Sequence, residues 1–408
     1  MSRKLTSLIL TLAILCGMLG TITGCASSGG SDKLVLALRS GTYADVIKAC
    51  LPDFEAEHGI TCEVLELSED DLHSYVLNDS VRGKGAYDLC MVDGSWVSEY
   101  IAEDVLADLG ALGYSFDDDI IPATTTICVQ NGKTYLVPYF GNVTVMMYNR
   151  DVAAGLGYDR HSFSSLEGIL NFCNKTSAAG NGGFVYRGDT ENNIVVDFLP
   201  VLCAFGGWVV DENNRPTVNT PEFNKAMEFY LELTATGGAL PKEDLISSIE
   251  DGSMVIAIGW PGWYDSKKSV SSDYAAFPGK YMDRSDSFNS NIYGIWTLGI
   301  PNNSANKETA TELLKFLMDK DVQKSTVSIG GVPCRYSSLT DPELLSADPH
   351  LEVICNALEN GKYRPVIQEW PKFYTILGNE MRKIMAGEIS VADGLNLAQQ
   401  ELDDMMSQ

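Results

Sequence analysis

The first part of the chain alternates apolar runs with stretches of helical period. Residues 33–38 form an apolar run that predicts a buried strand, and residues 43–58 then place apolar side chains on one helical face. The alternation continues with predicted strands at 60–67 and 88–92 and predicted helices at 72–81 and 95–103. This order predicts βαβ units in a mainly parallel sheet, whose ligands bind beyond the carboxyl ends of the strands.

The rest of the chain also contains both strand-like apolar runs and stretches of helical period. Asn131-Gly132 lies between two β-rich runs, 124–129 and 134–137, and predicts a two-residue hairpin. A chain of 408 residues exceeds what one hydrophobic core usually serves, so we expect two lobes. Further helices are expected at 164–174, 193–204, 221–235, 307–318, 370–386 and 391–405, and further strands at 254–258 and 292–298.

The N-terminus carries an export signal. Arg3 and Lys4 precede an apolar run at 8–19 that is too short to span a membrane. Small residues then lead into Gly24-Cys25, which resembles the lipobox of bacterial lipoproteins. We therefore expect a signal peptide at 1–24, a lipidated Cys25 on a flexible tether to residue 32, and a protein anchored on the extracytoplasmic face of the cell membrane. A plain signal peptide with an incidental cysteine is the alternative.

The net charge and the residues that could bind metal limit the kinds of partner and cofactor that we expect. The chain has 29 basic and 55 acidic residues, a net charge of −26, which repels nucleic acid but does not identify a neutral ligand. Its four histidines are not at zinc-ligand spacing, and we expect no metal or cofactor. Asp117-Asp118-Asp119 leaves a calcium site or a solvated helix cap open, and the cap is favoured. The eight cysteines after Cys25 form no CxxC pair and are interpreted as buried free thiols.

Several segments, in order and spacing, are similar to one family. The chain resembles the extracellular solute-binding proteins of ABC sugar importers, the broad family that includes maltose-binding protein. The segments that carry the resemblance are residues 87–93 with Trp96, 131–139 with Tyr148-Asn149, 205–207, 259–263, 294–296, 331–335, Gly387 and 391–395.

The resemblance implies an α/β fold of the periplasmic-binding-protein-like type II, with two discontinuous lobes, a hinge and a central ligand cleft. Lobe 1 would comprise 33–141 and 293–330, and lobe 2 142–292 and 331–408. The chain would cross between them near 141–144, 292–298 and 330–335. Family members trap a ligand by hinge closure and present it to the permease subunits of an ABC transporter. We expect a monomer.

A sugar ring has apolar faces and a rim of hydroxyl groups, so its site combines aromatic planes with charged or amide groups. Each candidate is also explained by core packing or by a solvated surface charge. The candidate aromatic contacts are Trp96, Tyr139, Trp260, Trp263, Trp296, Trp370 and Tyr374, and the candidate polar contacts are Arg39, Asp93, Asn142, Arg187, Asp197 and Arg335.

The favoured function is therefore binding of a mono- or oligosaccharide outside the cell, without catalysis, and its delivery to a transporter. A ligand-sensing lipoprotein that feeds a membrane sensor kinase would share the fold and the cleft. An extracellular polysaccharide-active enzyme is the third alternative, because acidic residues are abundant enough to supply a carboxylate pair. No GxSxG motif is present.

Overall fold

The computed structural model describes residues 33–263, 270–279 and 290–407. The expected signal peptide, Cys25 and the tether lie outside the described residues. Among the described helices, none combines the length and the apolar character that a membrane span needs.

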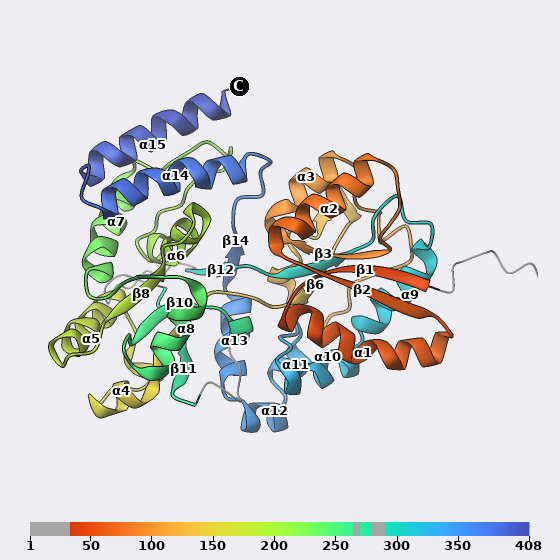
Figure 1. Cartoon of the computed structure of the whole chain (residues 1–408), viewed down its shortest axis with the longest axis horizontal. Coiled ribbons are helices and arrows are strands. Elements are labelled where there is room, and N and C mark those ends of the chain that lie inside the picture. Colours follow the sequence, from red (N-terminus) through yellow and green to blue (C-terminus); the bar gives the residue numbers. More distant parts are fainter. Residues whose placement is uncertain (1–32, 264–269, 280–289, 408) are drawn as a thin grey trace, which may run out of the picture. The chain divides into compact units, whose positions relative to one another are not determined.

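Lobe 1 is built on a five-stranded sheet in the order β2-β1-β3-β13-β6. β1 pairs in parallel with β2 and β3, whereas β13 runs antiparallel to β3 and β6. Helices cover both faces of the sheet (Figure 1). The strands are β1 (Lys33–Arg39), β2 (Thr61–Leu67), β3 (Leu89–Asp93), β6 (Val137–Phe140) and β13 (Trp296–Gly299), and the helices are α1 (Thr42–His58), α2 (Glu69–Val81), α3 (Val97–Ala102), α9 (Lys307–Leu317) and α10 (Lys320–Thr326).

Lobe 2 has a second five-stranded sheet, in the order β11-β7-β10-β8-β9. β10 pairs in parallel with β8 and antiparallel with β7. The strands are β7 (Val145–Asn149), β8 (Phe184–Arg187), β9 (Gly238–Leu240), β10 (Ile256–Gly259) and β11 (Ser272–Ala275). The helices are α4 (Arg150–Gly155), α5 (Leu166–Ala178), α6 (Glu191–Ala204), α7 (Pro221–Thr234), α8 (Lys242–Asp251), α14 (Trp370–Met385) and α15 (Val391–Met406).

The segments that join the lobes are bonded to one another. The Thr144 amide donates to the Ile292 carbonyl over 2.9 Å, and the Gly294 amide donates to the Asn142 carbonyl over 2.9 Å. β12 (Asn291–Tyr293) also pairs in parallel with β14 (Gly361–Tyr363), which leads into α14 (Figure 1). β14 is thus the strand that lies beside the first two crossings between the lobes, near residues 141–144 and 292–298.

Residues 330–335, implied as the third crossing, are held on lobe 1. The Gly141 amide donates to the Val332 carbonyl over 2.6 Å, and the Ile121 amide donates to the Cys334 carbonyl over 2.9 Å. After them, α11 (Tyr336–Leu339) packs against α10 of lobe 1, and α13 (His350–Glu359) packs against β7 and β11 of lobe 2. The short α12 (Pro342–Ala347) connects these two helices. Because this segment contacts both lobes, the boundary at residue 331 stays a prediction.

The expected hairpin is present, and two expected strands differ. β4 (Val129–Gln130) pairs with β5 (Lys133–Thr134), and Asn131 and Gly132 have φ of 52° and 76°, as a type I′ turn requires. The strand expected at 124–129 is wrong, because Pro122 begins a 3₁₀ turn that runs to Thr125. The strand expected at 292–298 is two strands, β12 and β13, which belong to different sheets.

Eight cysteines lie in the described residues, and all are free thiols. Seven are buried and Cys62 is partly buried. Burial raises the pKa of every one of these thiols, to about 12 for Cys90 and to about 11 for Cys62. The thiols therefore behave as small apolar groups.

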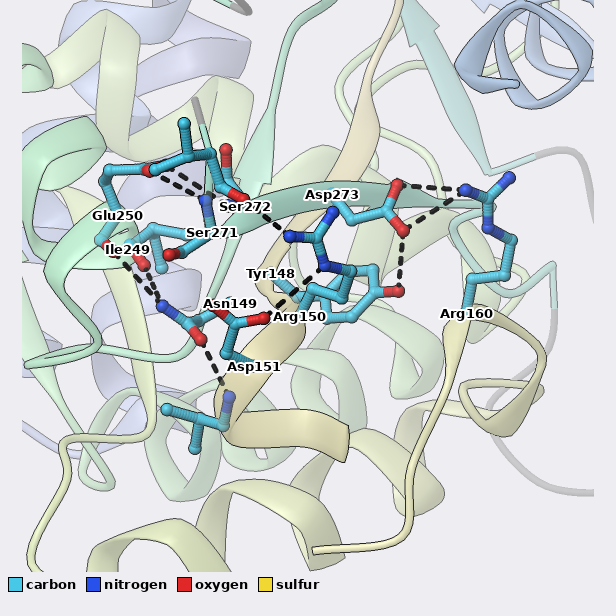
Figure 2. A network of polar contacts seen from close by, with 12 residues as sticks. Tyr148, Asn149, Arg150, Asp151, Arg160, Ile249, Glu250, Ser271, Ser272 and Asp273 are labelled. Atoms are coloured by element: carbon cyan, nitrogen blue, oxygen red, sulfur yellow. Dashed lines mark hydrogen bonds and ion pairs between the residues drawn. The ribbon is translucent and has the colours of Figure 1, made fainter. Parts of the chain in front are cut away.

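A buried carboxylate on β11 fixes α13 to lobe 2. Asp273 accepts hydrogen bonds from Arg160 Nη2 at 3.1 Å and from the Tyr148 hydroxyl at 3.1 Å (Figure 2). The His350 ring, on α13, lies 2.5 Å from the same carboxylate, and its other nitrogen is 3.1 Å from Asp348. Burial alone would raise the pKa of Asp273, but the hydrogen bond from His350 and the charges of His350 and Arg160 lower it to about 2.

This contact should make stability depend on pH. Burial lowers the pKa of His350, but the hydrogen bonds to Asp273 and Asp348 outweigh it and raise that pKa above its usual value. The ion pair therefore stabilises the fold fully below about pH 6.5, the unfolded pKa of histidine, and the gain is lost as pH rises through the higher folded pKa. At the acid end, the contribution of Asp273 is lost as pH falls below about 4 toward 2.

We expect His350→Gln to lower the free energy of unfolding by about 1.5–3 kcal/mol at pH 5.5, the range for hydrogen bonds to charged groups. The difference from the wild type should shrink by pH 9. Urea titrations of both proteins at several pH values measure it. A difference that is constant from pH 5 to pH 9 would show that His350 is neutral in the folded protein.

Candidate functional site

Strand ends from both lobes meet around one cavity. Arg39 ends β1 and Asp93 ends β3 in lobe 1, while Arg187 ends β8 and Trp260 follows β10 in lobe 2. All four line a cavity of about 130 Å³. Parallel strands place their carboxyl ends at one edge of a sheet, which is why residues distant in sequence converge there.

Aromatic rings form much of the wall. Trp296 of lobe 1 packs against Tyr43, with ring centres 5.6 Å apart, and the Arg39 guanidinium lies 5.9 Å from the Trp296 ring. Opposite, Trp260 and Trp263 come from the loop after β10. Burial raises the pKa of the Tyr43 hydroxyl to about 12, so this group is a neutral hydrogen-bonding partner.

Two arginines in the wall are held by carboxylates. Arg187 donates through Nε and Nη2 to Asp197 on α6, and its guanidinium lies 5.2 Å from the Trp263 ring. Arg364, just after β14, donates from Nη2 to both oxygens of Asp93 at 2.7 and 2.9 Å. Charged groups in this region are therefore fixed before any ligand arrives, which lowers the entropy cost of binding.

Three buried polar atoms of the wall have no hydrogen-bond partner among the described residues. They are Arg39 Nε, Asn192 Oδ1 and Trp260 Nε1. Buried polar groups in native proteins are nearly always paired, so unpaired ones next to a cavity are positions where a ligand can supply the partner.

The loop after β10 reaches across to lobe 1. The Gly262 amide lies 3.5 Å from Asn142 Oδ1, at the first crossing. A Cβ at Gly262 would come within 3.0 Å of the Tyr43 hydroxyl, and one at Gly294 would come within 2.7 Å of the Trp260 ring. Glycine at these two positions therefore allows the close approach of the two lobes around the cavity.

The structure brings seven of the thirteen predicted residues to this cavity: Arg39, Asp93, Asn142, Arg187, Trp260, Trp263 and Trp296. Asp197 lies directly behind, as the partner of Arg187. Trp96 packs edge-on against Trp296, which does line the cavity, and the centres of the two rings are 5.5 Å apart. Whether these residues contact a ligand stays a prediction.

The other four predicted residues, Tyr139, Trp370, Tyr374 and Arg335, do not line this cavity. Tyr139 is buried in the core of lobe 1. Its neighbour Phe140 packs against Tyr43 instead, because successive side chains of a strand point to opposite faces of the sheet. Trp370 is buried in the core of lobe 2 against Phe373. Tyr374 packs edge-on against Trp370, and its hydroxyl is near enough to the cavity for the charges of Glu69, Arg364 and Asp93 to act on its pKa, which burial raises.

Arg335 has a structural position on lobe 1. Its Nε donates to Gln323, its Nη1 to Asp117 at 2.8 Å and Asp119 at 3.3 Å, and its Nη2 to the Met318 carbonyl. Arg335, Asp117, Asp119 and Met318 border a surface hollow of about 620 Å³, larger than the cavity between the strand ends. Across the described residues there is no group of three or more side chains that could hold a metal ion.

Six further polar side chains of the wall were not among the predicted contacts: Tyr43, Glu69, Asn192, Asn193, Lys242 and Arg364. Glu69 begins α2 after β2, and the asparagines begin α6 after β8, so the rule that pointed to Arg39 and Asp93 applies to them. Burial raises the pKa of the Glu69 carboxyl, and the charge of Asp93 raises it further. Arg364 follows a short strand that no local pattern predicted.

Two α/β lobes joined by bonded crossing strands, with a polar and aromatic cavity at the ends of their strands, define a protein that binds a small solute. Residues 49–353 match the family model of bacterial extracellular solute-binding proteins. The chain belongs to that family, whose members work on the extracytoplasmic side of the membrane.

Named relatives agree with this assignment. A probable amino-acid ABC transporter periplasmic-binding protein of Sinorhizobium fredii is 24% identical over 378 residues, which cover 87% of this chain and 85% of the relative. The mannitol-binding protein of Pseudomonas aeruginosa is 22% identical, with 91% and 92% covered.

Solved structures share the fold. A solute-binding protein of Agrobacterium radiobacter in complex with ribitol superposes with a TM-score of 0.78 at 23% identity, covering 91% of this chain and 98% of that one. Maltose-bound MalE3 of T. maritima also gives 0.78, at 24% identity, with 91% and 99% covered.

Proposed function

We propose that this protein captures a sugar or sugar alcohol in the cavity between its lobes and delivers it to the permease of an ABC transporter. The observation that carries the proposal is the set of residues that lines the cavity. Trp260, Trp263 and Trp296 offer flat apolar faces. Arg39 Nε, Asn192 Oδ1 and Trp260 Nε1 belong to the same wall and have no hydrogen-bond partner in the part of the chain that the structure describes. Such a combination suits a ring with apolar faces and a hydroxyl rim.

The names of the relatives support the same ligand class. The mannitol-binding relative and the neighbours crystallised with ribitol and maltose bind polyhydroxylated solutes. The relative from Sinorhizobium fredii is named for amino acids, and the cavity does hold both carboxylates and arginines, so an amino acid is the second candidate. A sensing role with a membrane kinase would use the same ligand and would differ only in the protein partner.

The test is a ligand screen on the protein from residue 26 onward. Thermal shift with sugars, sugar alcohols and amino acids selects ligands, and calorimetry then measures affinity. We expect a polyhydroxylated ligand to bind one to one to a monomer and to be recovered chemically unchanged, as seen by NMR. Binding of amino acids alone would refute the sugar assignment, and turnover of a bound glycoside would refute the assignment as a binding protein.

We also propose that Cys25 is the lipid attachment site, on the basis of the leader and Gly24-Cys25. Cys25→Ala should move the protein from the membrane fraction to the soluble exported fraction, because the acyl groups on this cysteine are the proposed anchor. Immunoblotting of the fractions measures it, with Cys62→Ala as the matched control that stays in the membrane. If Cys25→Ala also stays membrane-bound, the anchor lies elsewhere.

A further inference from the structure

We infer that the ligand is a sugar that carries one oxyanion, a carboxylate or a phosphate, and that this group binds the unpaired edge of Arg39. The inference rests on the proposed function, because it names the kind of sugar that the same cavity takes. It follows from how the arginines of the wall are paired.

Three arginines line the cavity, and two already have a carboxylate. Arg187 is paired with Asp197, and Arg364 is paired with Asp93. Within the described ranges, Arg39 donates from Nη1 alone, to the Ser40 hydroxyl at 3.0 Å. Its Nε is buried and unpartnered, and neither Nε nor Nη2 has a carboxylate within ion-pair distance among the described residues. The side of the guanidinium formed by Nε and Nη2 is therefore unused.

This unused edge suits an anion better than a hydroxyl group. Nε and Nη2 are two parallel donors with the spacing of the two oxygens of a carboxylate or phosphate, which a single hydroxyl cannot satisfy. A guanidinium partly withdrawn from water also gains from a counter-charge. The Trp296 ring, 5.9 Å away, holds the guanidinium plane without using its donors.

The pairing of the basic side chains singles out Arg39. Four of them line the cavity, and three have a carboxylate partner: Arg187 with Asp197, Arg364 with Asp93, and the exposed Lys242 with Glu243. Glu69 shares the wall with Arg39 but is not within ion-pair distance of it among the described residues, although the charge of Arg39 lowers the pKa of Glu69 against the effect of burial. An anionic ligand would supply the partner that Arg39 lacks.

Calorimetry on the protein from residue 26 onward tests the inference with matched ligands. For the gluco, galacto and manno series, the neutral sugar, the uronic acid, its uronamide and the 6-phosphate are compared. One acid or phosphate should bind at least ~30-fold more tightly than its neutral counterpart, the factor expected for a charge-assisted pair. Comparison of the affinities for the uronic acid and for the 6-phosphate then identifies the oxyanion.

Arg39→Gln should abolish this preference, because glutamine has neither the charge nor the two parallel donors. Arg39→Lys keeps the charge but lacks the paired donors, and it should retain only part of the preference. Arg82→Gln, on an exposed arginine outside the cavity, is the matched control and should bind as the wild type does. Melting temperatures of the ligand-free variants verify that they fold.

The outcomes separate the two proposals. If a neutral sugar binds as tightly as its acid and phosphate, the charged ligand is refuted and sugar binding stands. If Arg39→Gln weakens neutral and charged sugars equally, Arg39 only supports the wall and the inference is refuted. If no member of any series binds while another class of solute does, the proposed function itself is refuted.

Discussion

Trp263→Ala is expected to weaken ligand binding at least ~30-fold, which corresponds to about 2 kcal/mol for the loss of an anchor in a desolvated site. Trp263 is only partly buried and lines the cavity against Arg187, so its removal should change the melting temperature of the ligand-free protein little. Calorimetry and thermal melting on the same preparations measure both effects.

Tyr139→Ala is the matched comparison, since Tyr139 is an aromatic residue buried away from the cavity. It should lower the free energy of unfolding by about 3–5 kcal/mol, the range for large aromatic truncations in cores, while the folded fraction binds normally. If instead Trp263→Ala melts early and binds normally, the Trp263 ring is a packing element and not part of the ligand site.

Asp197→Ala is expected to be the most destabilising single change near the cavity, because it leaves a buried arginine without its counter-charge. Asp197 is 1% exposed and accepts from the backbone amide, Nε and Nη2 of Arg187. Breaking a buried pair by removing one partner costs about 3–5 kcal/mol. Urea unfolding measures this cost, and affinity should fall as well, because Arg187 loses its fixed position beside Trp263.

Glu312→Ala is the control, since Glu312 pairs with Lys315 on the exposed side of α9. Exposed pairs of this kind contribute little, so its stability should match the wild type. A small effect of Asp197→Ala would mean that Arg187 finds another partner or water, and the fixed wall described above would not exist before binding.

The strand-end rule predicted from sequence that Arg39 and Asp93 lie at the cavity, because the rule depends only on local pattern. Arg39 and Asp93 each end an apolar run that forms a parallel strand, so their convergence follows from the sheet itself. Arg364 could not be found in this way. It reaches Asp93 across 271 positions of sequence, and only the tertiary path of β14 brings them together.

Two other errors have equally specific causes. Tyr139 and Phe140 are both aromatic, and which of them faces Tyr43 depends on the register of β6 against β13, which the pattern does not define because every residue of β6 is buried. The apolar run at 292–298 concealed a change of sheet at Gly294, where Trp260 leaves no room for a side chain. Continuous burial removes the alternation that would reveal such breaks.

The raised pKa values of the eight thiols make the folded and the unfolded chain differ in their sensitivity to oxidation. The thiolate is the species that oxidants and disulfides attack, so the folded chain resists oxidation outside the cell although it has no disulfide among its described cysteines. The unfolded chain has no such protection, since its thiols regain ordinary acidity. Mispairing is therefore a risk of the interval between translocation and folding, and rapid folding is what preserves the reduced state.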